Sequence, residues 1–119
     1  MMNSELKNRT KKFALEILKL VEQLPNTQTS RVIGNQILRS ATSVAANYRA
    51  ACRAKSPKDF IYKMGIVEEE SDETLFWLEM IQEAALLDTE NLKDLMNESN
   101  ELTAIFVSSL KTAKRNHSR

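Results

Sequence analysis

The chain has 119 residues, of which 42% are apolar and 28% are charged, and its formal net charge is +1. It contains only two glycines and two prolines, too few for the many tight turns of a β sandwich or barrel. A single cysteine, Cys52, and a single histidine, His117, exclude disulfide frameworks, zinc fingers and Cys/His nucleophile pairs. We therefore expect one helical domain with no enzymatic activity, no metal and no cofactor.

Membrane insertion and secretion are also not expected. No apolar run approaches the roughly 18 residues of a membrane span. The first apolar stretch, residues 13–24, is interrupted by charged side chains, unlike the core of a signal peptide. We expect a cytoplasmic protein.

Apolar spacing predicts two helices in the first half of the chain. A first helix over about 4–24 has one apolar face that begins at Phe13, and it ends before Pro25 because the residue before a proline leaves the α region. A second helix over about 31–54 follows, with Ser30 as its expected N-cap and an apolar face from Ile33 to Tyr48.

The second half predicts two longer helices. Ser56 and Pro57 are the expected N-cap and first residue of a helix over about 57–85. Its apolar seam alternates spacings of four and three, although Ser71 and Thr74 dilute its middle. A fourth helix over about 89–115, capped by Asp88 or Thr89, repeats the seam. Short connections between four amphipathic helices predict an all-α, up-down-up-down antiparallel four-helix bundle.

Charge is distributed unevenly along the chain. Residues 1–66 hold 12 Lys/Arg and four Asp/Glu, whereas residues 67–110 hold one lysine and 12 acids. Antiparallel helices would bring the cations to one end of the bundle, which we call the basic pole, opposed only by Glu5 and Asp59. The cations of the basic pole are Lys7, Arg9, Lys11, Lys12, Arg49, Arg53, Lys55, Lys58, Lys63, Lys111, Lys114, Arg115 and Arg119.

Helix dipoles account for part of this pattern, because cations stabilise the ends of the second and fourth helices. They do not account for cations at the starts of the first and third helices. Phosphate backbones are the commonest partner of clustered cations, so we expect an RNA or DNA partner. An acidic protein surface or plain solvation are the alternatives, and a pI of about 7.8 is low for a dedicated nucleic-acid domain. The candidate phosphate contacts are Lys11, Arg49, Arg53, Lys55, Lys58 and Lys63.

An acidic run, residues 68–73, contains five carboxylates in six residues. Like charges one turn apart destabilise a helix, so a compensating cation is expected. The register of the hairpin puts Arg39 about level with this run and predicts a structural salt bridge from Arg39 to Glu68 or Asp72.

The segment 75–81 is apolar around nearly the whole helix, which predicts a surface for self-association formed by Phe76, Trp77 and Met80. Base stacking is the alternative role of Trp77, but this residue lies toward the acidic end. Gly65 is about level with Ala46, which favours close packing of the second and third helices.

Two segments carry a family resemblance. The run from Gln36 to Asn47, and Ser56, Asp59, Phe60 and the stretch 69–75, resemble the second- and third-helix signatures of the 23S rRNA intervening-sequence proteins. The resemblance spans residues 6–114. Many members continue after the asparagine with Ile-Ala-Glu-Gly, whereas this chain has Tyr48-Arg49-Ala50-Ala51.

The resemblance implies a small cytoplasmic four-helix protein without enzymatic activity that assembles as a ring, typically a homopentamer. A related branch resembles the accessory variability proteins of diversity-generating retroelements, which bind nucleic acid and a reverse transcriptase. We therefore expect a homo-oligomeric bundle whose basic pole binds RNA or DNA without sequence specificity. The alternative is a scaffold that docks an acidic partner protein and has no nucleic-acid role.

Overall fold

The computed structural model describes residues 2–118, which form four α-helices and, within this range, no strand. The helices are α1 (Met2–Glu22), α2 (Gln28–Ala51), α3 (Pro57–Glu83) and α4 (Glu90–His117). The all-α class and the four helices predicted from the sequence are confirmed. Their observed ends differ from the predicted ends by three residues or fewer.

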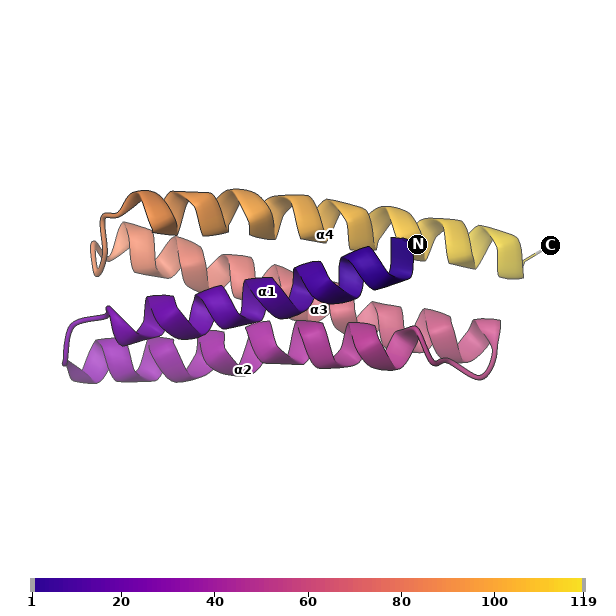
Figure 1. The fold of residues 1–119 in the computed structure, drawn as a ribbon, viewed down its shortest axis with the longest axis horizontal. Coiled ribbons are helices and arrows are strands. Elements are labelled where there is room, and N and C mark those ends of the chain that lie inside the picture. Colours follow the sequence, from indigo (N-terminus) through magenta and orange to yellow (C-terminus); the bar gives the residue numbers. More distant parts are fainter. Residues whose placement is uncertain (1, 119) are drawn as a thin grey trace.

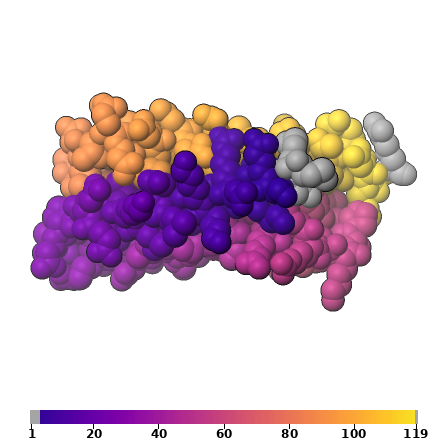
Figure 2. All heavy atoms as spheres, viewed as in Figure 1, coloured from indigo at the N-terminus to yellow at the C-terminus, as the bar shows by residue number. Residues whose placement is uncertain are grey.

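The helices lie side by side along an elongated molecule of 51 × 24 × 20 Å. Figure 1 shows successive connections at opposite ends, so each helix runs antiparallel to the one before it. The start of α1, the end of α2, the start of α3 and the end of α4 therefore lie toward the same end. In Figure 2 the indigo atoms of α1 stop short of that end, whereas the yellow atoms at the end of α4 extend further toward it.

Side-chain caps fix where three helices begin. Ser56 and Thr89 cap α3 and α4 as the sequence predicts, each accepting a hydrogen bond from a backbone amide three residues later. The N-cap of α2 is Thr27, so the prediction of Ser30 is wrong. Gln28 and Thr29 are already helical, and the amide of Ser30 donates to Thr27 Oγ1 at 3.2 Å while its own side chain is buried. The cap was misplaced because either residue type suits that position.

Apolar side chains from all four helices form one continuous core. The rings of Tyr48 and Phe106 pack at a centroid distance of 5.8 Å and join α2 to α4 inside it. Burial of this apolar surface is the main favourable contribution to folding. The largest fully buried apolar side chains are Ile17, Leu20, Ile37, Val44, Met64, Val67, Leu78, Ile81, Leu92, Leu102 and Phe106.

A layer of hydroxyl groups interrupts this core near its middle; we call it the hydroxyl layer, and it comprises Ser40, Ser71, Thr74, Ser99 and Thr103. A hydrogen bond of 2.9 Å joins the buried Thr74 Oγ1 to Ser40 Oγ between α3 and α2. Another of 2.7 Å joins Ser71 Oγ to Thr103 Oγ1 between α3 and α4. Ser99 Oγ is buried with no partner among the described residues. These hydrogen bonds stabilise one register of the helices, because a shift along the axis would separate the donor from the acceptor.

The hydroxyl layer yields a paired prediction. Thr74→Val keeps the shape of the side chain but removes the bond to Ser40, so it should lower the free energy of unfolding by about 1 kcal/mol. Ser99→Ala removes a hydroxyl that already lacks a partner and should be neutral or stabilising. Urea denaturation at one fixed protein concentration measures both. Equal losses in the two variants would contradict the role given to the hydroxyl layer.

Candidate nucleic-acid interface

The fold places most of the predicted cations toward one end, but Lys12 lines a hollow with Glu16, Asp94 and Glu98 near the start of α4. The start of α1, the end of α2, the start of α3 and the end of α4, which carry these residues, lie toward the end at which α2 and α3 are connected (Figure 1). Arg119 lies outside the described residues. Twelve cations of the predicted basic pole therefore have a described position, and their surroundings decide which of them could meet an anion.

Two of these cations already have carboxylate partners. Arg9 donates two hydrogen bonds to Glu98, at 2.7 and 2.8 Å, and one to Glu101 at 2.9 Å, tying α1 to α4. The hydrogen bonds to Glu98 are the largest cause that raises the pKa of Arg9. The expectation that only Glu5 and Asp59 oppose the basic pole is therefore wrong, because α4 brings two further acids beside α1.

Lys63 is the second neutralised cation. Its ammonium donates a hydrogen bond of 3.0 Å to Asp59 Oδ2, one helical turn earlier on α3. This hydrogen bond and one from the backbone N–H of Lys55 lower the pKa of Asp59 below its ordinary 3.8. Lys63 was predicted as a phosphate contact, but it would first have to release Asp59. Lys63 stays a predicted contact that starts from an ion pair.

The remaining ten cations take part in no ion pair within residues 2–118. All ten are exposed. They are Lys7, Lys11, Lys12, Arg49, Arg53, Lys55, Lys58, Lys111, Lys114 and Arg115.

Four of them line a groove of about 550 Å³ between α1 and α2. Lys7 and Lys11 come from α1, and Arg49 and Arg53 come from α2 and the residues just after it. None of the described residues that line this groove is acidic. Away from the basic pole the lining becomes small or apolar, with Ala14, Leu15, Leu18, Thr42, Ala45 and Ala46. The groove can therefore hold an anion between two helices, and its continuation can hold apolar atoms.

Lys55 and Lys58 are the other two predicted phosphate contacts. Lys55 lies in the connection between α2 and α3, and Lys58 lies in the first turn of α3. Arg53 lies two residues after the end of α2, so these cations continue the row that starts in the groove. Of the six predicted contacts, five form no ion pair within residues 2–118, and Lys63 is paired with Asp59.

Two further hollows lie at this end. One of about 470 Å³ has both Cys52 and His117 in its lining, and the other, of about 700 Å³, lies between Leu6, Tyr48, Phe60 and α4. Residues 2–118 contain no group of three His, Cys, Asp or Glu side chains that could hold a metal ion. Burial is the largest cause that raises the pKa of Tyr48 above its ordinary 10.0. Neither hollow therefore adds a cluster of metal-binding side chains to the basic pole among the described residues.

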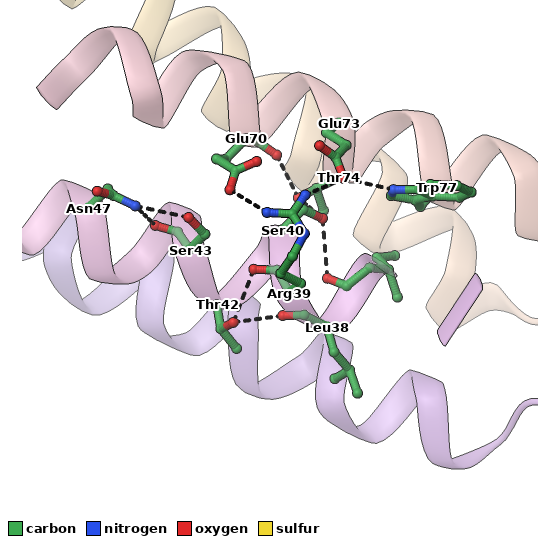
Figure 3. A network of polar contacts seen from close by, with 11 residues as sticks. Leu38, Arg39, Ser40, Thr42, Ser43, Asn47, Glu70, Glu73, Thr74 and Trp77 are labelled. Atoms are coloured by element: carbon green, nitrogen blue, oxygen red, sulfur yellow. Dashed lines mark hydrogen bonds and ion pairs between the residues drawn. The ribbon is translucent and has the colours of Figure 1, made fainter. Parts of the chain in front are cut away.

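Arg39 does bridge α2 to α3, but its partners differ from those expected. Its guanidinium pairs with Glu70 at 2.7 Å and with Glu73 (Figure 3). Glu73 also accepts a hydrogen bond of 3.1 Å from the Trp77 indole. The predicted partners, Glu68 and Asp72, are wrong because they lie on a different side of α3 from Glu70 and Glu73.

Two of the three residues predicted to form the self-association surface are exposed to solvent. Phe76 and Met80 are 49% and 37% exposed, whereas Trp77 packs partly against the core. The rings of Phe76 and Trp77 pack edge to face at a centroid distance of 4.9 Å. Since Ser40 lies opposite Thr74, the antiparallel register brings Val32, which is 55% exposed, about level with Met80 to Gln82. Val32, Phe76 and Met80 are therefore exposed apolar side chains at similar levels along the bundle, away from the basic pole.

Tyr62 and Gly65 differ from what sequence reasoning anticipated. Tyr62, on α3, is 69% exposed, and it went unnoticed because one aromatic residue outside the apolar seam makes no periodic pattern. Gly65 was expected to allow close packing, but a Cβ atom there would meet nothing within 4 Å. Gly34 makes the close approach instead, since its Cβ would lie 3.2 Å from Val21.

No helix within residues 2–118 is both long and apolar enough to cross a membrane.

The architecture is that of an all-helical bundle, and comparisons with known proteins identify its family. The family model for the 23S rRNA-intervening sequence protein matches residues 2–108. The chain belongs to this family, as its second- and third-helix segments indicate. No curated protein matches.

A solved structure is similar over almost its whole length. It is a protein of unknown function from the S23 ribosomal protein family of Bacteroides thetaiotaomicron. The two chains are 36% identical and superpose with a TM-score of 0.84, covering 93% of this chain and 99% of the other. The bundle is thus shared within the family.

The Arg39 network predicts a specific pH dependence. The hydrogen bonds from Trp77 and Arg39 lower the pKa of Glu73 below its ordinary 4.5. The folded state then holds this proton less tightly than the unfolded state, so the stabilisation is complete above about pH 4.5 and is lost as the pH falls through the lowered pKa. Glu73→Gln should lower the Tm at neutral pH, and its difference from the wild type should shrink as the pH falls below that value.

Glu69→Gln is the matched control, because Glu69 is exposed and forms no ion pair among the described residues. It removes one charge from the same acidic run and should not lower the Tm. Thermal melts from neutral pH into the acid range compare the two variants. Equal behaviour of both would show that only the total charge of the run matters.

Proposed function

We propose that this protein is a non-enzymatic helical bundle that assembles as a homo-oligomer and binds RNA or DNA without sequence specificity at its basic pole. The observation that carries the proposal is the groove between α1 and α2, where Lys7, Lys11, Arg49 and Arg53 converge without a lining carboxylate. Cations left unpaired on neighbouring helices repel one another, and a phosphate backbone would relieve that repulsion. Lys55 and Lys58 would extend the binding surface along the α2–α3 connection.

The homo-oligomer rests on a different surface. The exposed Phe76 and Met80, with Val32 at a similar level of the bundle, lie away from the basic pole, so subunits could join there and leave the basic pole accessible. The family resemblance favours a ring of five copies. A ring would repeat the basic pole around one axis, and repetition of a weak binding site raises the overall affinity.

One observation favours a second function. Leu15 and Leu18 are 49% and 39% exposed and continue the groove beyond its cations. An acidic amphipathic helix of a partner protein would use both halves of the groove, as a helix docked on an apolar surface does. A scaffold of this kind would need no nucleic acid.

Salt-dependent binding separates the two functions. Wild-type protein should bind a random-sequence RNA at about 50 mM salt, with a steep fall of log affinity against log salt. Arg49→Gln with Arg53→Gln should weaken binding and flatten the slope by about 0.7 for each phosphate of a single strand that is no longer neutralised. The control Lys19→Gln with Arg31→Gln removes the same charge from the opposite end and should change neither value. No binding at about 50 mM salt would exclude the proposed function and favour the scaffold.

Light scattering tests the assembly. The wild type should be larger than the 13.6 kDa monomer at micromolar concentration. Phe76→Asp with Met80→Asp should reduce its mass, because two charges cannot be buried unpaired in an apolar interface. A monomeric wild type, or an unchanged mass of this variant, would exclude the role given to these residues.

A further inference from the structure

Tyr62 is the most exposed large apolar side chain of the described residues, at 69%. It lies on the second turn of α3, close to the α2–α3 connection and therefore at the basic pole. Its neighbours on the core side, such as Met64, are buried, so Tyr62 contributes little to folding. Its hydroxyl makes no hydrogen bond to any described residue. The fold thus presents an aromatic ring to solvent one helical turn from the unpaired Lys58 and close to the Asp59–Lys63 ion pair.

The surroundings of Tyr62 leave the ring accessible. One turn before it on α3 is Lys58, and just under one turn after it is Gly65, beside which a Cβ would meet open space. The register set by Ser40 and Thr74 brings Tyr62 about level with Ala50 to Cys52 on α2, where the side chains are small. No bulky side chain is therefore expected to cover the ring from these positions.

An open aromatic ring beside lysines is the arrangement with which proteins bind single-stranded nucleic acids. Every base has a face that can stack on the ring, and the phosphates on either side meet the cations. Bases inside a duplex are already stacked and paired, so they cannot use such a ring. The distinction matters because cations alone attract single strands and duplexes alike.

We propose that the basic pole binds single-stranded nucleic acid in preference to duplex, with an unpaired base stacked on Tyr62 and adjacent phosphates at Lys58 and Arg53. This inference rests on the proposed function and adds the class of nucleic acid to it. Tyr62 would supply the preference for single strands, and the cations would supply the salt-dependent attraction.

Fluorescence anisotropy with an unstructured oligonucleotide and a duplex of equal length tests the inference. Tyr62→Ala and Tyr62→Leu should each weaken binding of the single strand by about fivefold to a hundredfold. Both should leave duplex binding and the salt slope unchanged. Tyr62→Phe is the matched control, because it keeps the ring and should keep the affinity. Circular dichroism and light scattering confirm that each variant is folded and assembled as the wild type is.

The outcomes separate this inference from the proposed function. A wild type that binds neither ligand at about 50 mM salt overturns both. A wild type that binds single strand and duplex equally, with Tyr62→Ala unchanged, overturns the inference alone. A Tyr62→Ala variant that loses affinity for both ligands and also loses mass makes Tyr62 a subunit contact, which overturns the inference as well.

Discussion

The register between α2 and α3 is the constraint on which the rest of this structure depends. Two interactions hold it, the buried hydrogen bond between Ser40 and Thr74 and the bridge from Arg39 to Glu70 and Glu73 (Figure 3). A slip of about one helical turn would bring the apolar Leu78 opposite Ser40 and leave hydroxyls buried without partners. Each orphaned group costs about 1–3 kcal/mol. Apolar burial alone tolerates such slips more easily, because one apolar neighbour replaces another.

This register has an electrostatic consequence. Because α2 ends and α3 begins at the same end, Arg53, Lys55 and Lys58 collect there, and Lys7 and Lys11 of α1 lie across the groove. Close cations repel one another, and dipoles offset that cost only where a helix ends. The fold neutralises Arg9 and Lys63 internally and leaves the other ten described cations of the basic pole without ion pairs within residues 2–118. Unpaired charge at one end, and exposed apolar side chains away from it, are the physical basis for the two surfaces proposed above.

Sequence reasoning recovered the elements but not all of their mutual contacts. Breakers such as Pro25 and Pro57, and the apolar spacing, are local signals, and they predicted four helices with ends correct to three residues. Counting residues outward from the turn between two helices also estimates which of their residues lie opposite one another. This count identified Arg39 as a bridging residue. Such a count does not tell which side of α3 faces α2, so Glu68 and Asp72 were predicted in place of Glu70 and Glu73. The bridge from Arg9 to Glu98 joins the first and last helices, and no local pattern predicts an interaction between residues so distant in the chain.

The central claim is that the topology gathers scattered cations into one surface for nucleic acid. Amide chemical-shift mapping by NMR, with a short unstructured oligonucleotide added at low salt, tests it most directly because it locates the binding surface without any substitution. We expect the shifts to concentrate in residues 7–11 and 49–62 and to spare residues 76–80. Shifts spread evenly over the bundle, confined to its acidic half, or absent altogether would contradict this claim.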